Sequence, residues 1–204
     1  MEKIRWGIIG TGKIAHTFAE ALAGTEDAEL LAVASRTQEK AQAFADKFGF
    51  AKAYGSYKEL AEDTDVDVVY IATPMASHYG DAKLCISGGR NVLCEKSLAL
   101  NTAQTEDILA YAKEKGVFFM EAMWMKCRPV FLKVIEWINS GKIGEPRCIK
   151  ADFSNYIPYD ENDRLYRPDC GGGALLDLGV YPLTFADAIF GTPDEIITTA
   201  QISG

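Results

Sequence analysis

Short apolar runs alternate with amphipathic stretches along the first half of the chain. Each run is bounded by glycine, proline or polar residues, as is typical of a buried strand. Between the runs, apolar side chains recur every three or four positions, as on one face of a helix. The predicted strands span residues 4–9, 30–34, 66–72, 91–94 and 117–120. Strand and helix alternate with short turns, which predicts an α/β fold: a doubly wound parallel sheet with helices on both faces.

The helices between these strands carry their own start and stop signals. After Thr37, which is a suitable N-cap, apolar residues fall at i, i+3, i+4 and i+7, and Gly49 ends the pattern. Ser56 and Glu59 fit a capping box that opens another short helix. Further helices are predicted over 14–22, up to Ser87, and over 102–115.

The pattern changes after residue 122. The elements predicted beyond it are a helix, a strand, a polar and aromatic segment, a glycine-led helix and a last strand, over 130–139, 145–153, 156–169, 171–190 and 196–202. These few elements are too few to close a second core. We therefore expect a first domain over 1–122 and an incomplete second domain over 123–204.

Composition and charge exclude several classes of function. Lys and Arg total 21 against 29 Asp and Glu, and the net charge of −8 argues against a nucleic-acid partner. No apolar run approaches the roughly 18 residues of a membrane helix, and the N-terminus does not resemble a signal peptide. The five cysteines form no C-x-x-C pair and there are only two histidines, which argues against a metal site. We expect a cytoplasmic protein with reduced thiols and no membrane partner.

A glycine-rich turn follows the first predicted strand and opens a helix. Its residues, which fit G-x-G-x-x-A, are Gly10, Thr11, Gly12, Lys13, Ile14 and Ala15. The first glycine allows the tight turn, the second lets the backbone approach a pyrophosphate, and the free N–H groups of the helix attract phosphate. The run from Gly7 to Lys13 also matches the start of a P-loop, but Ile14 replaces the hydroxyl that holds magnesium. The remaining alternative is a plain tight turn.

The end of the second strand bears on the choice of cofactor. Folds specific for NAD usually have Asp or Glu there, to bind the ribose 2′-hydroxyl. This chain has Ser35, Arg36 and Thr37. Arg36 suits a 2′-phosphate and the hydroxyls of its neighbours add donors, so we expect NADP, with NAD as the alternative. An ordinary surface arginine would give the same sequence.

Several motifs together resemble the glucose-fructose oxidoreductase / inositol dehydrogenase (Gfo/Idh/MocA-type) family, with the closest likeness to its dihydrodiol dehydrogenase and NADP-dependent xylose dehydrogenase branch. The likeness covers essentially the whole chain. The motifs are GTGKIA at 10–15, AYGSY at 53–57, LCEK at 93–96, MEAMW at 120–124 and GGGALLDLGVY at 171–181. The resemblance implies a dinucleotide-binding Rossmann domain followed by an α+β domain with an open antiparallel sheet.

Three features depart from the family pattern. Ser97 stands where Glu-Lys-Pro is usual, which predicts a less rigid loop around Lys96. Met75 stands where asparagine often follows Thr-Pro. The chain is also shorter than family members, so we expect it to be a fragment that holds only the beginning of the second domain.

Three residues are candidates for catalysis. Lys96 lies beyond the carboxyl end of a strand, where open parallel sheets bind ligands, and its ammonium would stabilise a developing alkoxide. Asp177 and Tyr181 are four positions apart, on one helix face. Tyr181 would act as general acid and base, helped by a nearby cation such as Lys96, and Asp177 would orient substrate or base. By position alone, each is equally an ordinary surface or half-buried residue, and the resemblance favours catalysis.

Further residues are predicted near the cofactor. Glu95 would orient Lys96, which itself borders the cofactor. The resemblance places the loop of Thr73, Pro74 and His78 near the nicotinamide ribose, while a solvated histidine at a helix start is the alternative. Cys94 is expected to be a buried strand cysteine rather than a nucleophile. Trp124 and the aromatic residues of 156–166 would wall a substrate pocket or pack in a core.

These observations predict an NADP-dependent dehydrogenase that transfers a hydride between nicotinamide and a carbinol carbon. The resemblance implies a sugar, cyclic polyol or dihydrodiol as substrate, no metal, and a homo-oligomer. The alternative is a protein of this fold that senses NADP without catalysis.

Overall fold

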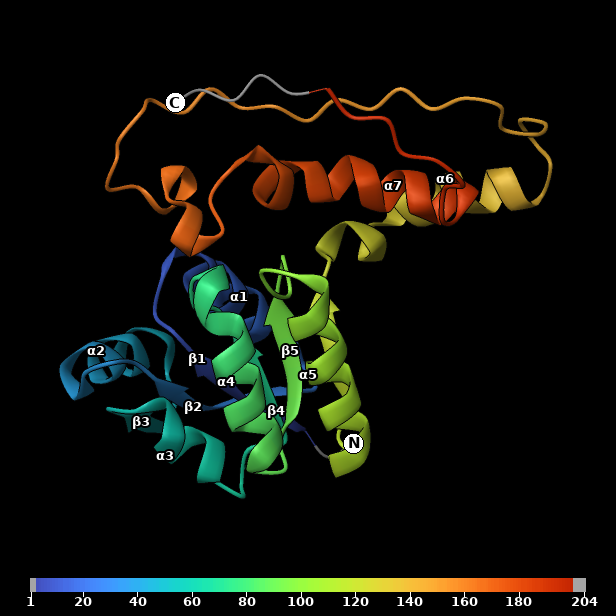
Figure 1. The fold of residues 1–204 in the computed structure, drawn as a ribbon. Helices are drawn as coiled ribbons and strands as arrows, with labels where there is room; N and C mark the ends of the chain where they lie inside the picture. The colour runs from blue at the N-terminus through green and yellow to red at the C-terminus, as the bar shows by residue number, and fades with distance from the viewer. Residues whose placement is uncertain (1–2, 200–204) are drawn as a thin grey trace.

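A six-stranded parallel sheet forms the first part of the molecule. The computed structural model describes residues 3–199 of the chain (Figure 1). The strands are β1 (Ile4–Ile9), β2 (Ala28–Ala34), β3 (Lys52–Tyr54), β4 (Val68–Ile71), β5 (Asn91–Glu95) and β6 (Phe119–Ala122). Their order, β3-β2-β1-β4-β5-β6, is that of a Rossmann fold, and the strand order reverses between β1 and β4. The prediction of a doubly wound parallel sheet is confirmed.

Helices cover both faces of this sheet. They are α1 (Lys13–Ala23), α2 (Gln38–Phe48), α3 (Tyr57–Glu62), α4 (Met75–Ser87) and α5 (Thr102–Lys115). Neighbouring residues of one strand point to opposite faces. Ile8 belongs to a core cluster with residues of α1 and α2, whereas Ile9 belongs to a second cluster with residues of α3, α4 and α5. Figure 1 shows these helices around the sheet. Burial on both faces explains why the strands read as continuous apolar runs.

The short edge strand β3 was not predicted. It has three residues, Lys52 among them, and all three are only partly buried, so it gives no apolar run. The last strand, β6, begins two residues later than expected at Phe119. The predicted caps are confirmed: Thr37 accepts a hydrogen bond from the backbone of Lys40 at 3.4 Å, and Ser56 accepts one from Glu59 at 3.3 Å.

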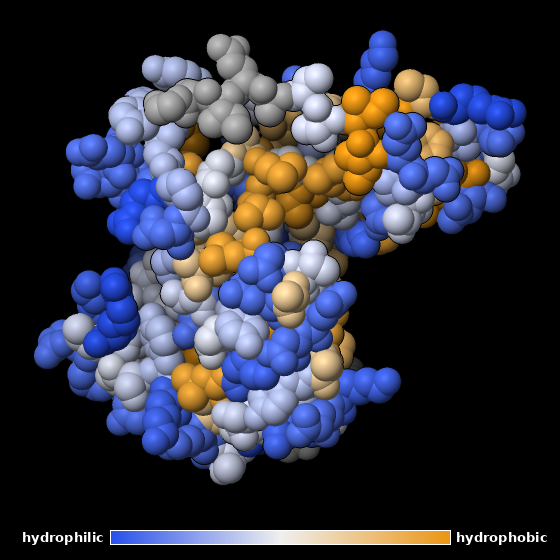
Figure 2. Space-filling model, in the orientation of Figure 1, coloured by the Kyte–Doolittle hydropathy of each residue, from blue (hydrophilic) through white to orange (hydrophobic). Residues whose placement is uncertain are grey.

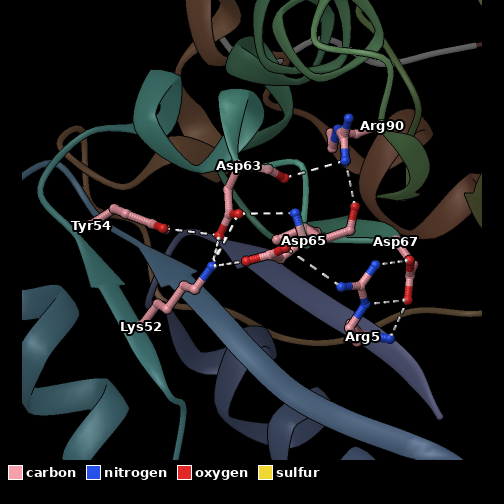
Figure 3. A network of polar contacts seen from close by, with 8 residues as sticks. Arg5, Lys52, Tyr54, Asp63, Asp65, Asp67 and Arg90 are labelled. Carbon is pink, nitrogen blue, oxygen red and sulfur yellow. Dashed lines mark hydrogen bonds and ion pairs between the residues drawn. The ribbon is translucent and has the colours of Figure 1, made fainter.

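Ion pairs join the amino ends of the strands (Figure 3). The guanidinium of Arg5 in β1 donates to both carboxylate oxygens of Asp67, at 2.8 and 3.1 Å. Lys52 at the start of β3 pairs with Asp63 at 2.9 Å and with Asp65 at 2.7 Å. Arg90 donates to the carbonyl of Val66 at 2.7 Å. This network lies at the amino ends of the strands, opposite the carboxyl ends that form the candidate site. Its members are Arg5, Lys52, Tyr54, Asp63, Asp65, Asp67 and Arg90.

Two helices lie across the carboxyl ends of the strands. They are α6 (Pro129–Asn139) and α7 (Val180–Phe190), and α7 is preceded by a π-helix, Leu175–Gly179 (Figure 1). Neither α6 nor α7 buries a residue, and apolar side chains gather on this part of the surface (Figure 2). By length and composition alone, the helical stretch Pro168–Phe190 could cross a membrane, and one such stretch is weak evidence of a membrane span.

The strands predicted after residue 122 are not observed within the described residues. The segment 145–153 runs without ladder hydrogen bonds, as do residues 196–199, while 200–202 lie outside the described residues. A strand requires a neighbour with which to pair its backbone groups, and neither segment makes such a pairing among the described residues. The predicted antiparallel sheet is therefore not seen.

Candidate active site

A cavity of about 1080 Å³ lies between the carboxyl ends of the strands and the π-helix. Residues from β1, β2, β4 and β5, or from the loops that follow them, form one wall. The other wall consists of Trp124, Arg164, Leu176, Asp177 and Tyr181. Of the sequence-predicted residues, these line the cavity: Gly10, Thr11, Gly12, Lys13, Ile14, Ser35, Arg36, Thr73, Pro74, His78, Glu95, Lys96, Asp177 and Tyr181.

The glycine-rich turn has the geometry that a pyrophosphate requires. Gly10 has φ of +94°, and a Cβ there would lie 2.9 Å from the carbonyl oxygen of Ala72. Gly12 precedes α1, and a Cβ there would meet nothing within 4 Å. Its backbone is therefore open to a ligand at the positive end of the helix. Ala15 is fully buried against the sheet.

Cations gather at the end of the cavity next to β2. Among the described residues, Arg36 makes no ion pair. Lys40 and Lys47 of α2 line the same end, and sequence reasoning missed them although they are seven positions apart and so share a helix face. Ser35 is buried and its hydroxyl lies 3.2 Å from that of Thr11. Thr37 caps α2 and does not line the cavity.

Glu95 is held in place by a buried tyrosine. The hydroxyl of Tyr70 in β4 donates to one carboxylate oxygen of Glu95, and the backbone N–H of Lys96 donates to the other at 3.2 Å. Burial, and next the charge of Glu95, raise the pKa of Tyr70 well above its usual range. Tyr70 therefore remains a hydrogen-bond donor. Sequence analysis missed this role because Tyr70 reads as one more apolar strand residue.

Lys96 and Asp177 meet although 81 residues separate them. The ammonium of Lys96 donates to the carbonyl oxygen of Asp177 at 2.8 Å, and it lies 3.5 Å from Asp177 Oδ1. Arg164 Nη2 also lies 3.5 Å from that same oxygen. Two cations thus share one carboxylate. The side chains of Lys96 and Asp177 are 16% and 21% exposed.

Tyr181 lies beside this pair and is held by aromatic neighbours. The indole Nε1 of Trp124 donates to its hydroxyl at 2.9 Å. Lys96 Nζ lies 5.1 Å from the centre of its ring, and Phe153 packs edge-on against it at 5.1 Å. An indole N–H only donates, so the tyrosine hydroxyl keeps its own proton free for another acceptor.

His78 is buried, so the alternative of a solvated histidine is wrong. It is 1% exposed, and its two ring nitrogens lie 3.0 Å from the carbonyl oxygen of Ser97 and 2.9 Å from that of Thr73. His78 therefore joins the two loops that border the cavity. The hydroxyl of Thr73 donates to Asp81 at 2.6 Å, and burial raises the pKa of Asp81.

Thiol chemistry finds no support at this site. Cys94 is fully buried in β5, as the sequence predicted, and burial raises the pKa of its thiol far above the usual range. Within residues 3–199, no group of three or more His, Cys, Asp or Glu side chains is arranged to hold a metal ion.

Two family models match this chain. Residues 4–123 match the model of the Gfo/Idh/MocA oxidoreductase family with an NAD-binding Rossmann fold, and residues 131–203 match the model of the family's C-terminal domain. The chain belongs to this family. The predicted resemblance, which included dihydrodiol dehydrogenases and NADP-dependent xylose dehydrogenases, is confirmed by the relatives described next.

Similar proteins are dehydrogenases and ketoreductases. A trans-1,2-dihydrobenzene-1,2-diol dehydrogenase from Xenopus laevis is 40% identical over 95% of this chain and 59% of its own length. A D-xylose 1-dehydrogenase (NADP(+)) from Hypocrea jecorina is 40% identical over 89% and 52%. A 3-ketoreductase from Actinomadura kijaniata, solved with NADP, is 33% identical with a TM-score of 0.79, over 93% and 58%. The chain thus spans about 59% of the length of the first of these relatives.

Proposed function

We propose that this chain is part of an NADP-dependent dehydrogenase that interconverts a secondary alcohol and a carbonyl on a sugar, cyclic polyol or dihydrodiol. The observation that carries the proposal is the meeting of Lys96 and Asp177, 3.5 Å apart beside Tyr181, in the wall of a cavity with a dinucleotide-type glycine turn. A protein that only bound the cofactor would not need a cation, a carboxylate and a tyrosine gathered where the carbinol carbon of a substrate would lie.

The cofactor site fits NADP in shape and charge. The open backbone of Gly12 would face the pyrophosphate, and Arg36 would face the 2′-phosphate with a guanidinium that no ion pair in the described residues occupies. Glu95, Thr73 and His78 would border the nicotinamide ribose. When bound, the nicotinamide accepts or donates the hydride.

The residues of the chain would manage the proton and the charge on oxygen. The ammonium of Lys96 donates to the reacting oxygen and stabilises negative charge as it develops there. In reduction, Tyr181 Oη gives its proton to the carbonyl oxygen as the hydride adds to carbon, which leaves a phenolate; in oxidation, this phenolate form takes the proton of the alcohol. Asp177 accepts from Lys96 and from a neighbouring substrate hydroxyl, which fixes the orientation of both.

The remaining features of the proposal concern the whole protein. We propose a Rossmann domain over 1–122 and part of a substrate and oligomerisation domain over 123–204, supported by the separate matches of the two family models. The protein would be soluble and cytoplasmic, form a homo-oligomer, and bind neither nucleic acid nor membrane. The negative net charge supports the exclusion of nucleic acid.

The test is to titrate the chain with NADP and NAD, and then to assay turnover by the complete protein with D-xylose and a trans-dihydrodiol, using the absorbance of reduced nicotinamide. We expect saturable binding with NADP preferred, and turnover of at least one of the two substrate types. Tight NADP binding without turnover of either type would favour the sensor. No binding of either cofactor by a folded chain would contradict the cofactor site.

A further inference from the structure

The hydroxyl group of Ser97 joins the loop that carries Lys96 to the helix that carries Asp177. Ser97 follows β5 and is 7% exposed. Its Oγ donates to the carbonyl oxygen of Leu176 at 2.8 Å. The ammonium of Lys96 donates to the next carbonyl oxygen, that of Asp177, also at 2.8 Å. Two consecutive residues of one loop therefore hold two consecutive carbonyl groups of the π-helix.

The backbone of Ser97 is fixed from the opposite side. Its carbonyl oxygen lies 3.0 Å from Nδ1 of the buried His78. The next residue, Leu98, donates its backbone N–H to the carboxylate of Glu121 at 2.9 Å. The loop is thus anchored to the Rossmann domain through its main chain, and the side chain of Ser97 is the part that reaches across the cavity wall. The sequence predicted a less rigid loop because Ser97 stands where proline is usual, and it did not predict the hydrogen bond made by the serine side chain.

The helix that receives this bond has an unusual geometry. Leu175–Gly179 is a single turn of π-helix. Such turns are rare in proteins, and those that occur are often found at functional sites. A carbonyl oxygen has two lone pairs, so a donor from outside the helix adds to whatever the helix supplies. The bond from Ser97 therefore holds the turn that presents the Asp177 carboxylate to Lys96.

We propose that Ser97 is a positioning residue, which sets the separation between the ammonium of Lys96 and the carboxylate of Asp177 by joining the loop to the π-helix. The side chain of Lys96 is long and has many rotamers. Anchoring the residue next to it on the same helix restricts where its ammonium lies. The catalytic consequence rests on the proposed function, in which Lys96 and Asp177 act together on the substrate.

The first test needs no substrate. Lys96 is labelled with an amine-reactive reagent in the wild-type chain, in Ser97→Ala and in Ser97→Thr. Peptide mass spectrometry measures the labelling rate of Lys96 relative to that of the exposed Lys113. We expect labelling of Lys96 to be several-fold faster in Ser97→Ala and near the wild-type rate in Ser97→Thr, which keeps a hydroxyl. Ser87→Ala is the matched control, since it removes a bond of 2.7 Å to a carbonyl within α4. Equal labelling of Lys96 in Ser97→Ala and wild type would overturn the proposal.

The second test uses turnover. We expect Ser97→Ala to lower kcat about tenfold, as misplacement of a catalytic group does, with an unchanged Kd for NADP and a larger isotope effect for the transferred hydrogen. An unchanged kcat, or a rise in the Kd for NADP alone, would count against the positioning role. If the complete wild-type protein turns over neither substrate type, the proposed function fails, and the labelling result still decides the role of Ser97.

Discussion

One carboxylate oxygen, Asp177 Oδ1, lies 3.5 Å from two cations, Lys96 and Arg164. The sequence could suggest Lys96 and Asp177 because each belongs to a motif at a strand or helix end. It could not suggest Arg164, which begins a 3-10 helix of only three residues, too short to show a periodic pattern. Residue-scale chemistry here depends on contacts between positions that are far apart in the chain.

The roles assigned to Lys96 and Tyr181 lead to a prediction for turnover. In the complete protein, Lys96→Met and Tyr181→Phe should each lower kcat about a hundredfold or more, because each removes a group that donates to or exchanges a proton with the reacting oxygen. The Kd for NADP, measured by tryptophan fluorescence, should remain near the wild-type value. Near-normal turnover in either variant would refute its role.

The guanidinium of Arg36, which makes no ion pair within residues 3–199, leads to a prediction for cofactor choice. Arg36→Ala should weaken NADP binding by about 1.5–3 kcal/mol, the loss expected for a hydrogen bond to a charged group, and should leave NAD binding nearly unchanged. Calorimetric titration with both cofactors measures the difference. Lys113→Ala, which removes an exposed cation from α5, is the control. An equal loss for the two cofactors would contradict the assignment.

At the scale of elements, the turn between β1 and α1 was predictable and the π-helix was not. The turn depends on glycines at fixed spacing after an apolar run, and this information is local. The π-helix accepts hydrogen bonds at Leu176 and Asp177 from a loop that is distant in the chain, and no local pattern of residues records these bonds. The segment 171–181 therefore predicts a helix but not its wider turn.

The two glycines of the β1–α1 turn should respond differently to substitution. Gly12→Ala should fold normally, because a Cβ there meets nothing within 4 Å, and should weaken NADP binding about tenfold or more by blocking the pyrophosphate. Gly10→Ala should lower the thermal midpoint instead. Its positive φ costs an L-residue about 1–2 kcal/mol, and the new Cβ would lie 2.9 Å from the carbonyl oxygen of Ala72.

Thermal unfolding and NADP titration of both variants separate the two effects. A Gly12→Ala chain that folds and binds NADP as tightly as wild type would show that the pyrophosphate lies elsewhere. A Gly10→Ala chain of wild-type stability would show that the turn relaxes without cost.

At the scale of the whole molecule, the amino and carboxyl ends of the strands have different roles. The amino ends are tied by the network of ion pairs in Figure 3, while the carboxyl ends border the cavity. Polar groups that stabilise the fold and polar groups proposed for chemistry are thereby kept apart. Substitutions in the network should alter stability and leave cofactor binding unchanged.

Because of this network, we expect the free energy of unfolding to change with pH in the acid range. The hydrogen bonds from Arg5 hold the pKa of Asp67 below its usual value, so its ionised form favours folding. That contribution is present above the unfolded value, about 3.9, and is lost as the pH falls through the lower pKa of the folded state. We expect Asp67→Asn to be less stable than wild type at neutral pH and to approach it at acid pH. Urea unfolding across this pH range measures the difference, and a constant gap would contradict the prediction.

The sequence by itself determined the doubly wound sheet, most of its strands and helices, the helix caps and the glycine turn. Each of these depends on periodicity or on a few adjacent residues, which are written locally in the chain. The sequence also predicted strands after residue 122, and those were wrong within the described residues, because a strand requires a partner that a single segment cannot supply.

Only the tertiary structure decided which side chains meet. It brought Lys96 to Asp177 across 81 residues, placed Trp124 on Tyr181, buried Tyr70 beneath Glu95, and linked Ser97 to Leu176. These contacts join loops at the ends of different strands to the helices that lie across them. Their geometry follows from the packing of the whole chain, and no local pattern of residues records it.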